Sequence, residues 1–259
     1  MNPVAPQGAG ERPAEGLLPD EEDEMGELLV QVEGLEVRRG AFTLSVPTWR
    51  LEAGTVTGLV GANGAGKSTL LAAVAGFNAV DGGTVRVFGL DPFVRAVEVR
   101  TQLGFMSDEA PLFDLRVGPL IRTVSGYYPS WNKGLAQSLI DRFAVEPSRR
   151  VRELSRGEGT RLRLVLALAF EPRVVLLDEP STGLDLDGHR ALLQTILEVV
   201  RDEGRSVVVS SHRLEDVERI ADQLLVLDRG RVVTAGSTET LIGPDRTLDE
   251  ALLAWGGAS

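Results

Sequence analysis

The chain has 259 residues, 43% hydrophobic and 25% charged, which is enough to bury a core in one large domain, with or without an inserted subdomain. It contains no cysteine, which excludes disulfides, thiolate metal ligands and a cysteine nucleophile. The net charge of −11 argues against nucleic acid as a partner, because neutralising phosphates requires clustered Lys and Arg. No run approaches the roughly 18 apolar residues of a membrane span. The N-terminus lacks the pattern of a secretory signal, so we expect a soluble protein.

The first 27 residues have the composition of a tail. They hold eight acidic residues and one arginine, a net charge of −7, and too few large apolar residues to pack. The rest of the chain therefore carries only −4. We predict that residues 1–27 form a disordered acidic extension outside the folded domain.

From Leu28 onward, β-like runs alternate with runs that have helical spacing of apolar residues. We predict strands at 28–32, 42–46, 55–60, 84–88, 173–177, 206–210 and 223–227. We predict helices after Gly66, through 162–169, up to Gly204, at 214–221 and, as a short helix, at 248–255. The stretch at about 92–150 is predicted to be mostly helical and irregular. This alternation predicts βαβ units and a mainly parallel sheet.

A phosphate-binding loop is indicated at residues 61–68. Their sequence, GANGAGKS, fits G-x-x-x-x-G-K-[ST] between an apolar strand and a helix. The glycines allow successive backbone N–H groups to converge on phosphate oxygens at the positive end of that helix. Lys67 can reach the β- and γ-phosphates, and the Ser68 hydroxyl can bind Mg²⁺. A glycine-rich turn with an incidental lysine is disfavoured, because Lys67 is one of only two lysines in the chain.

Two further strand ends carry candidate catalytic residues. Asp178 and Glu179 end an apolar run, at the edge where open α/β sheets place ligands. Asp178 is a candidate Mg²⁺ ligand, and Glu179 is a candidate to polarise an attacking water. The alternative is a pair of solvated acids in a turn before Pro180. His212 follows another strand and is either a donor to the γ-phosphate or an ordinary surface histidine.

A helix start at Ser155 has two readings. Glu158 lies three residues later, which is the spacing of a capping box. The N-terminus of a helix with small residues can also bind an anion. Spacing alone leaves both readings open.

Together these motifs resemble the ATP-binding cassette family, the nucleotide-binding subunits of ABC transporters. The resemblance covers residues 28–235 and implies a P-loop NTPase fold: α/β, with a mainly parallel core sheet, an N-terminal antiparallel β subdomain and an inserted helical subdomain at about 105–160. Residues 236–259 would be a short C-terminal helical segment. The cofactors implied are ATP and Mg²⁺.

The resemblance also assigns roles to individual residues. Glu179 and His212 would be catalytic, and Asp185 would belong to the D-loop. The nucleotide-binding residues would be Gly61, Asn63, Gly64, Ala65, Gly66, Lys67, Ser68, Thr69 and Arg39. The metal ligands would be Ser68, Asp178 and Asp108. The signature motif, which would contact ATP bound to a second cassette, would be Ser155, Arg156, Gly157 and Glu158.

Three departures from the family pattern affect these assignments. Asp108 replaces the Q-loop glutamine with a shorter, charged side chain. Arg39 stands where an aromatic residue usually stacks on adenine, with Phe42 nearby as a substitute. Arg156 and Glu158 replace Gly and Gln of the signature, and Glu158 adds negative charge near a triphosphate.

Partners and location follow from the resemblance. Residues 127–132 and the signature resemble the bacterial ABC-2-type branch, in which a cassette pairs with a second cassette and powers a separately encoded membrane subunit. The protein would be cytoplasmic, peripheral on the cytoplasmic face of the membrane, and export is the expected direction. One alternative is a soluble cassette ATPase in assembly or repair, such as iron–sulfur cluster biogenesis. Another, suggested by Asp108, is a subunit that binds ATP but hardly hydrolyses it.

Overall fold

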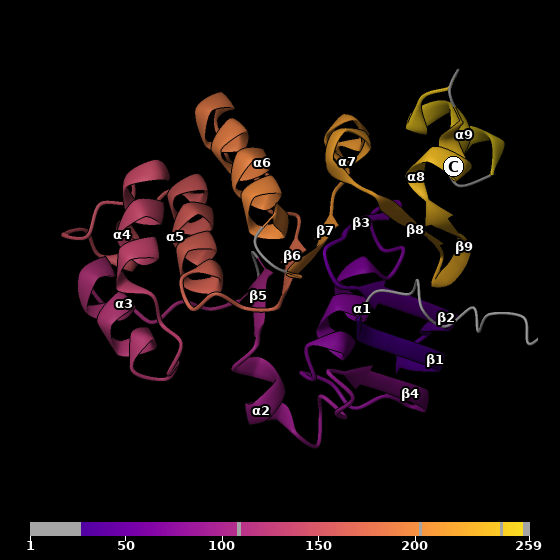
Figure 1. The fold of residues 1–259 in the computed structure, drawn as a ribbon, viewed down its shortest axis with the longest axis horizontal. Coiled ribbons are helices and arrows are strands. Elements are labelled where there is room, and N and C mark those ends of the chain that lie inside the picture. Colours follow the sequence, from indigo (N-terminus) through magenta and orange to yellow (C-terminus); the bar gives the residue numbers. More distant parts are fainter. Residues whose placement is uncertain (1–26, 108–109, 202–203, 244–245, 256–259) are drawn as a thin grey trace, which may run out of the picture.

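One sheet crosses the whole computed structural model, which describes residues 27–107, 110–201, 204–243 and 246–255 (Figure 1). Its strands in chain order are β1 (Leu28–Arg39), β2 (Phe42–Glu52), β3 (Val56–Val60), β4 (Gly82–Val87), β5 (Leu103–Ser107), β6 (Val174–Asp178), β7 (Ser206–Ser210), β8 (Gln223–Asp228) and β9 (Arg231–Ser237). In space they follow the order β4-β1-β2-β9-β8-β3-β7-β6-β5. The predicted acidic tail lies outside the described residues, apart from Glu27.

The sheet combines a parallel centre with antiparallel strands on one side. β8, β3, β7, β6 and β5 are parallel neighbours. β3, β6 and β7 are buried at every position, as expected for apolar strands covered on both faces. β1 pairs antiparallel with β2 and β4, and β8 with β9. The predicted α/β fold of a P-loop NTPase is confirmed.

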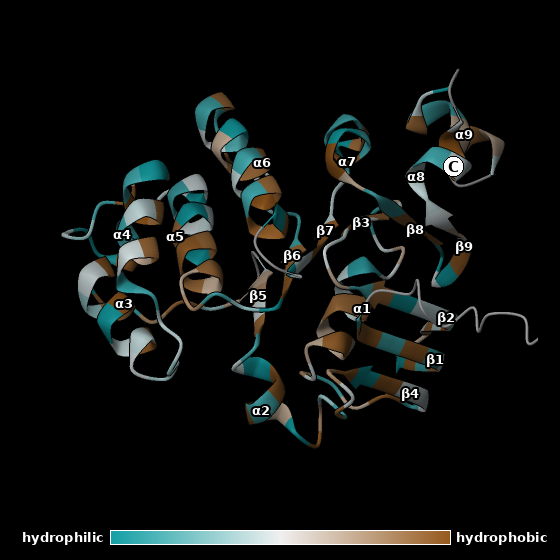
Figure 2. Cartoon of the chain, in the orientation of Figure 1, coloured by the Kyte–Doolittle hydropathy of each residue, from teal (hydrophilic) through white to brown (hydrophobic). Residues whose placement is uncertain are grey.

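The helices are α1 (Lys67–Val74), α2 (Ala96–Arg100), α3 (Val117–Ser125), α4 (Lys133–Arg142), α5 (Arg156–Leu168), α6 (Leu186–Arg201), α7 (Leu214–Ile220), α8 (Thr238–Ile242) and α9 (Leu248–Ala254). α3, α4 and α5 form a group at the end of the molecule away from β1, β2 and β4 (Figure 1). α3 and α6 carry hydrophobic and hydrophilic residues on different sides, as amphipathic surface helices do (Figure 2). Among the described residues, no helix has the length and hydrophobicity needed to cross a membrane.

The central strands are packed on both faces because their side chains alternate. Along β6, Val175 and Leu177 join a core formed with helices α3 to α7. Val174 and Leu176 join a second core formed with α1 and the strands β1 and β2. The end of β6 is thereby held rigidly between two packed layers.

Two strands differ from the prediction. Leu103–Ser107 forms β5 inside the stretch predicted to be helical and irregular, because its apolar residues pair in parallel register with β6. β9 was not predicted. None of the residues Arg231–Ser237 is buried, and the strand forms by antiparallel pairing with β8. β1 and β2 are longer than predicted, because they form one continuous hairpin closed by the turn after Arg39.

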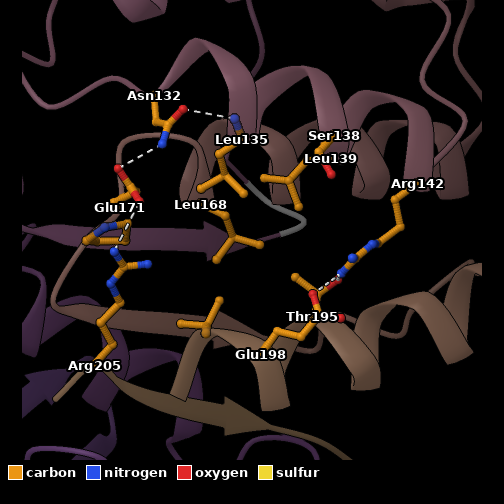
Figure 3. Close-up of a pocket in the computed structure, with 12 residues that line it drawn as sticks. Asn132, Leu135, Ser138, Leu139, Arg142, Leu168, Glu171, Thr195, Glu198 and Arg205 are labelled. Atoms are coloured by element: carbon orange, nitrogen blue, oxygen red, sulfur yellow. Dashed lines mark hydrogen bonds and ion pairs between the residues drawn. The ribbon is translucent and has the colours of Figure 1, made fainter. Parts of the chain in front are cut away.

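Polar contacts join α4 to the core beside a cavity of about 200 Å³ (Figure 3). Arg142 of α4 forms an ion pair of 2.5 Å with Glu198 of α6. Asn132 donates to Glu171 at 3.1 Å, and Arg205 donates to the same carboxylate at 3.2 Å. These contacts hold the α3–α5 group against α6 and the strands that lead to the site.

Leu139 is expected to stabilise this group of helices. Its side chain is 2% exposed and packs in the core shared by α4, α5 and α6. Leu139→Ala should lower the free energy of unfolding by about 2–5 kcal/mol, because it leaves a cavity. Urea unfolding followed by circular dichroism measures the change. Ser138→Ala, exposed on the same helix, is the control and should stay within about 0.5 kcal/mol of the unaltered chain.

Candidate active site

The loop between β3 and α1 follows a path that only glycine permits at two points. At Gly66, the residue before α1, φ is 111°, and a Cβ atom would lie 2.9 Å from Leu44 Cδ1. A Cβ atom on Gly61 would lie 2.3 Å from the Leu227 carbonyl oxygen. The loop therefore packs against β2 and β8 and leaves the N-terminus of α1 open.

A cleft of about 410 Å³ lies at that helix N-terminus. Its lining comes from the loop, from the start of β2 and from the segment after β6. The lining residues are Phe42, Asn63, Gly64, Gly66, Lys67, Ser68, Thr69 and Glu179. Backbone N–H groups at the start of a helix have no intrahelical partner, so the cleft suits an anion.

Phe42, rather than Arg39, lies at this cleft. Arg39 is exposed at the turn between β1 and β2, where its guanidinium donates to the Arg38 carbonyl at 3.1 Å. The Phe42 ring lies beside the loop, with Cζ 3.2 Å from where a Cβ atom of Gly66 would be. Of these two residues, only Phe42 thus lines the cleft.

Three candidate residues from separate elements meet beside the cleft. Lys67 Nζ donates to the Gly61 carbonyl at 2.7 Å and lies 3.5 Å from Glu179 Oε1. Glu179 Oε2 is 2.6 Å from His212 Nδ1. Only 6% of Lys67 is exposed, so water screens its positive charge little. A cation, a carboxylate and an imidazole are therefore assembled at one point.

Glu179 has two unusual features. Its Oε1 atom is buried and has no hydrogen-bond partner among the described residues. Its φ is 51°, in the left-handed region that non-glycine residues seldom occupy. Such a conformation persists where the surroundings impose it, and it concentrates at functional sites. This oxygen has no hydrogen bond but faces the Lys67 ammonium at 3.5 Å, so its negative charge lies next to the phosphate-binding loop.

Ser210, at the end of β7, connects the two acidic residues. Its hydroxyl donates to Asp178 Oδ1 at 2.7 Å and accepts from the Glu179 N–H at 2.9 Å. The sequence reasoning missed Ser210. Its position two residues before His212, at the end of a neighbouring strand, was the available signal.

The predicted metal ligands are only partly described. Ser68 lines the cleft, and Asp178 is 6% exposed at the end of β6. Asp108 lies outside the described residues. Within the described ranges, no group of three or more His, Asp or Glu side chains is arranged to hold a metal ion.

The signature motif forms the predicted capping box. Ser155 Oγ accepts from the Glu158 N–H at 3.3 Å, and the Ser155 N–H donates to Glu158 Oε2 at 2.8 Å. These bonds, led by the one from the backbone N–H, hold the pKa of the Glu158 carboxyl below its usual range. Glu158 also pairs with Arg149 at 2.5 Å. Its negative charge is thus compensated within the chain.

The signature helix α5 contacts the D-loop of the same chain. A Cβ atom on Gly157 would lie 2.2 Å from the Gly183 carbonyl oxygen, so the two backbones touch. Asp185 accepts from the Gly188 N–H at 2.9 Å and pairs with Arg161 of α5 at 2.5 Å. The Gly188 N–H, followed by the guanidinium, holds the pKa of Asp185 below its usual range. Arg161 was not singled out from the sequence.

The glycine-rich loop, the acidic end of β6 and His212 around one cleft define a nucleotide-binding domain of the P-loop class. Residues 44–182 match the family model described as ABC transporter. The chain belongs to this family of ATP-binding, transport-coupled ATPases.

Relatives support the assignment. The chain is 31% identical over 179 residues to the ABC transporter ATP-binding protein YtrB of Bacillus subtilis, covering 69% of this chain and 61% of that protein. It is 32% identical over 224 residues to the daunorubicin resistance ATP-binding protein DrrA3 of Streptomyces coeruleorubidus, covering 84% and 71%.

Solved structures show the same fold. The ATP-binding subunit of an ABC transporter superposes with a TM-score of 0.81 at 24% identity, over 88% of this chain and 99% of that one. A dimeric ATP-binding cassette in a post-hydrolysis state, bound to ADP and phosphate, superposes with a TM-score of 0.68 at 19% identity, over 81% and 99%.

Ser210 provides a stability test of the site. Ser210→Ala leaves the buried Asp178 carboxylate and the Glu179 N–H short of a partner, so the free energy of unfolding should fall by about 1–3 kcal/mol. Ser206, at the other end of β7, donates to the Glu52 carbonyl at 2.8 Å and is the matched control. Ser206→Ala should cost similar stability, measured by urea unfolding. Only Ser210→Ala should also lower ATP turnover.

Proposed function

We propose that this chain is the ATPase subunit of an exporter. It binds ATP and Mg²⁺ in the cleft at α1, pairs with a second cassette, and drives a separately encoded membrane subunit from the cytoplasmic face. The observation that carries the proposal is the convergence of Lys67, Glu179 and His212 beside a cleft lined by the phosphate-binding loop.

Different residues of the cleft have different roles in hydrolysis. Backbone N–H groups of the loop hold the phosphates, and Lys67 places a positive charge on them. Glu179 orients the attacking water and accepts its proton at Oε1, which faces Lys67 until a phosphate takes the ammonium, while His212 holds the other carboxylate oxygen. The contacts among Lys67, Glu179 and His212 on which these roles depend all lie within one chain.

Ser68 and Asp178 suit Mg²⁺. A hydroxyl and a carboxylate are the hard oxygen ligands this ion prefers, and it keeps waters and phosphate oxygens as its other ligands. The cleft of about 410 Å³ that Ser68 and Glu179 line leaves room for a hydrated cation. When bound, Mg²⁺ neutralises charge on the β- and γ-phosphates.

The signature motif of one cassette would complete the site of the other. The exposed start of α5, with Ser155 and Arg156, would set the positive end of this helix, at Gly157, against a γ-phosphate. Light scattering on Glu179→Gln tests the pairing: with ATP the mass should double, and with ADP it should stay that of one chain. One-chain mass at saturating ATP would contradict the pairing.

Relatives and an exposed apolar surface support a membrane partner. Besides DrrA3, a relative named Nod factor export ATP-binding protein I, from Rhizobium etli, is 32% identical over 205 residues. Others are named for phosphate import and manganese transport, so the family includes both directions. Phe93, Val94 and Val97, around the start of α2, are 53%, 73% and 78% exposed. A contiguous apolar surface of this kind is typical of an interaction site.

Co-purification from membranes tests the partner. The full chain should bring down one integral membrane protein, and Val94→Ser with Val97→Ser should weaken that association without changing ATP binding. Arg190→Ser, an exposed change on α6, is the control. Recovery of an assembly scaffold instead of an integral protein would favour the assembly or repair alternative.

A further inference from the structure

A buried, hydrogen-bonded pair of side chains lies behind the two segments that carry Glu179 and His212. His189 Nε2 on α6 is 2.7 Å from Asp216 Oδ2 on α7, and each side chain is 10% exposed. α6 and α7 stand next to each other above the ends of β6 and β7 (Figure 1). Neither residue lines the nucleotide cleft, so the proposed hydrolysis does not use the pair directly.

The pair packs against the backs of both loops. A small cavity of about 10 Å³ is lined by the pair together with Pro180, Ser181 and Ser211. The first two follow the candidate catalytic glutamate in the chain, and Ser211 precedes the candidate catalytic histidine. Because protein interiors are close-packed, a shift of the pair is transmitted to these loops.

Each member of the pair is also anchored to a functional loop. The His189 N–H donates to the carbonyl of Asp185, the D-loop residue at the start of α6, at 2.9 Å. Asp216 Oδ2 is 3.4 Å from Arg213 Nε, and the Asp216 N–H donates to the Arg213 carbonyl at 3.2 Å. Arg213 is the residue directly after His212.

We propose that His189 is a positioning residue for ATP hydrolysis. Through Asp216 and Arg213 it holds His212 against Glu179, and through the first turn of α6 it ties that arrangement to the D-loop. Asp216 contacts both His189 and Arg213, and removing one partner of a buried carboxylate leaves it uncompensated, so the loss of His189 reaches Arg213 through Asp216. The inference rests on the proposed function, since it requires Glu179 and His212 to act on bound ATP.

Two substitutions separate the hydrogen bond from the bulk of the side chain. His189→Leu removes the donor and keeps an apolar group of moderate size, whereas His189→Gln places an amide N–H donor near the position of Nε2. On the purified full chain, the affinity for a fluorescent ATP analogue should stay within about twofold in both. Turnover should fall about tenfold or more in His189→Leu, because a misplaced catalytic group loses rate steeply, and stay within about threefold in His189→Gln.

The decisive measurement is a double-mutant cycle with His212→Ala. If His189 acts through His212, His189→Leu lowers turnover no further in the His212→Ala background. An equal fractional loss in both backgrounds overturns the proposal, because that is the behaviour of a purely structural residue. Equal turnover in the Leu and Gln variants overturns it as well.

A second variant covers the case in which His189→Leu does not fold. Asp216→Asn keeps the shape of the side chain and removes its charge, and it must show the same loss of turnover and the same dependence on His212. Thermal unfolding of each variant establishes that it is folded. Wild-type turnover in His212→Ala alone would contradict the proposed function, whereas an effect of His212→Ala without one of His189→Leu or Asp216→Asn would contradict only the positioning role.

Discussion

Replacing Glu179 with Gln is expected to lower ATP turnover by at least about a hundredfold while leaving ATP affinity unchanged. An amide cannot accept the proton of the attacking water, and general-base catalysis contributes roughly 10²–10⁴ in rate. The amide keeps the shape of the carboxylate, and its single oxygen can still face either Lys67 or His212. Phosphate release with saturating ATP and Mg²⁺ measures turnover, and equilibrium binding measures affinity.

Glu215→Gln is the matched control for this substitution. It makes the same chemical change on the exposed first turn of α7, away from the cleft, and should leave turnover unaltered. Full turnover in Glu179→Gln would remove Glu179 from the catalytic role. Lost ATP binding in that variant would show instead that the carboxylate is needed to hold the loop.

Lys67→Ala is expected to weaken ATP binding about 10- to 100-fold. The ammonium group is the cation at the phosphate-binding loop, and hydrogen bonds to charged groups contribute about 1.5–3 kcal/mol each. Its present contacts are the Gly61 carbonyl and Glu179, which a phosphate would share or replace. Titration calorimetry with ATP measures the loss.

Lys133→Ala is an unusually close control, because Lys133 is the other lysine of the chain and is exposed at the start of α4. It should leave ATP affinity within about twofold. Equal affinities of the two variants and the unaltered chain would show that the backbone of the loop alone binds the phosphates.

The features that the sequence predicted are local ones. The phosphate-binding loop is a contiguous pattern whose glycines are required by contacts at Gly61 and Gly66. The capping box at Ser155 follows from a three-residue spacing and forms as expected. The apolar strands β3, β6 and β7 stood out because continuous burial leaves continuous hydrophobic runs.

The features that it missed depend on residues far apart in the chain. β9 exists because β8 pairs with it, and its own sequence has no strong strand pattern. Ser210 and Asp178 are 32 positions apart, and His189 and Asp216 are 27. These residues come into contact only when the parallel strands, and the helices that follow them, are packed side by side. Phe42 lies at the cleft instead of the predicted Arg39 for the same reason, since the pairing of β1 with β2 sets which side chain faces the phosphate-binding loop.

The backbone at Glu179 implies a conflict between durability and activity. A left-handed conformation at a non-glycine residue costs on the order of 1–3 kcal/mol, which glycine would avoid. Glu179→Gly relieves this strain but also removes the carboxylate that faces the buried Lys67 ammonium, so the gain in stability is offset. The strained backbone and the charge that it carries into the cleft thus come together, and stability is given up at this position to place a carboxylate.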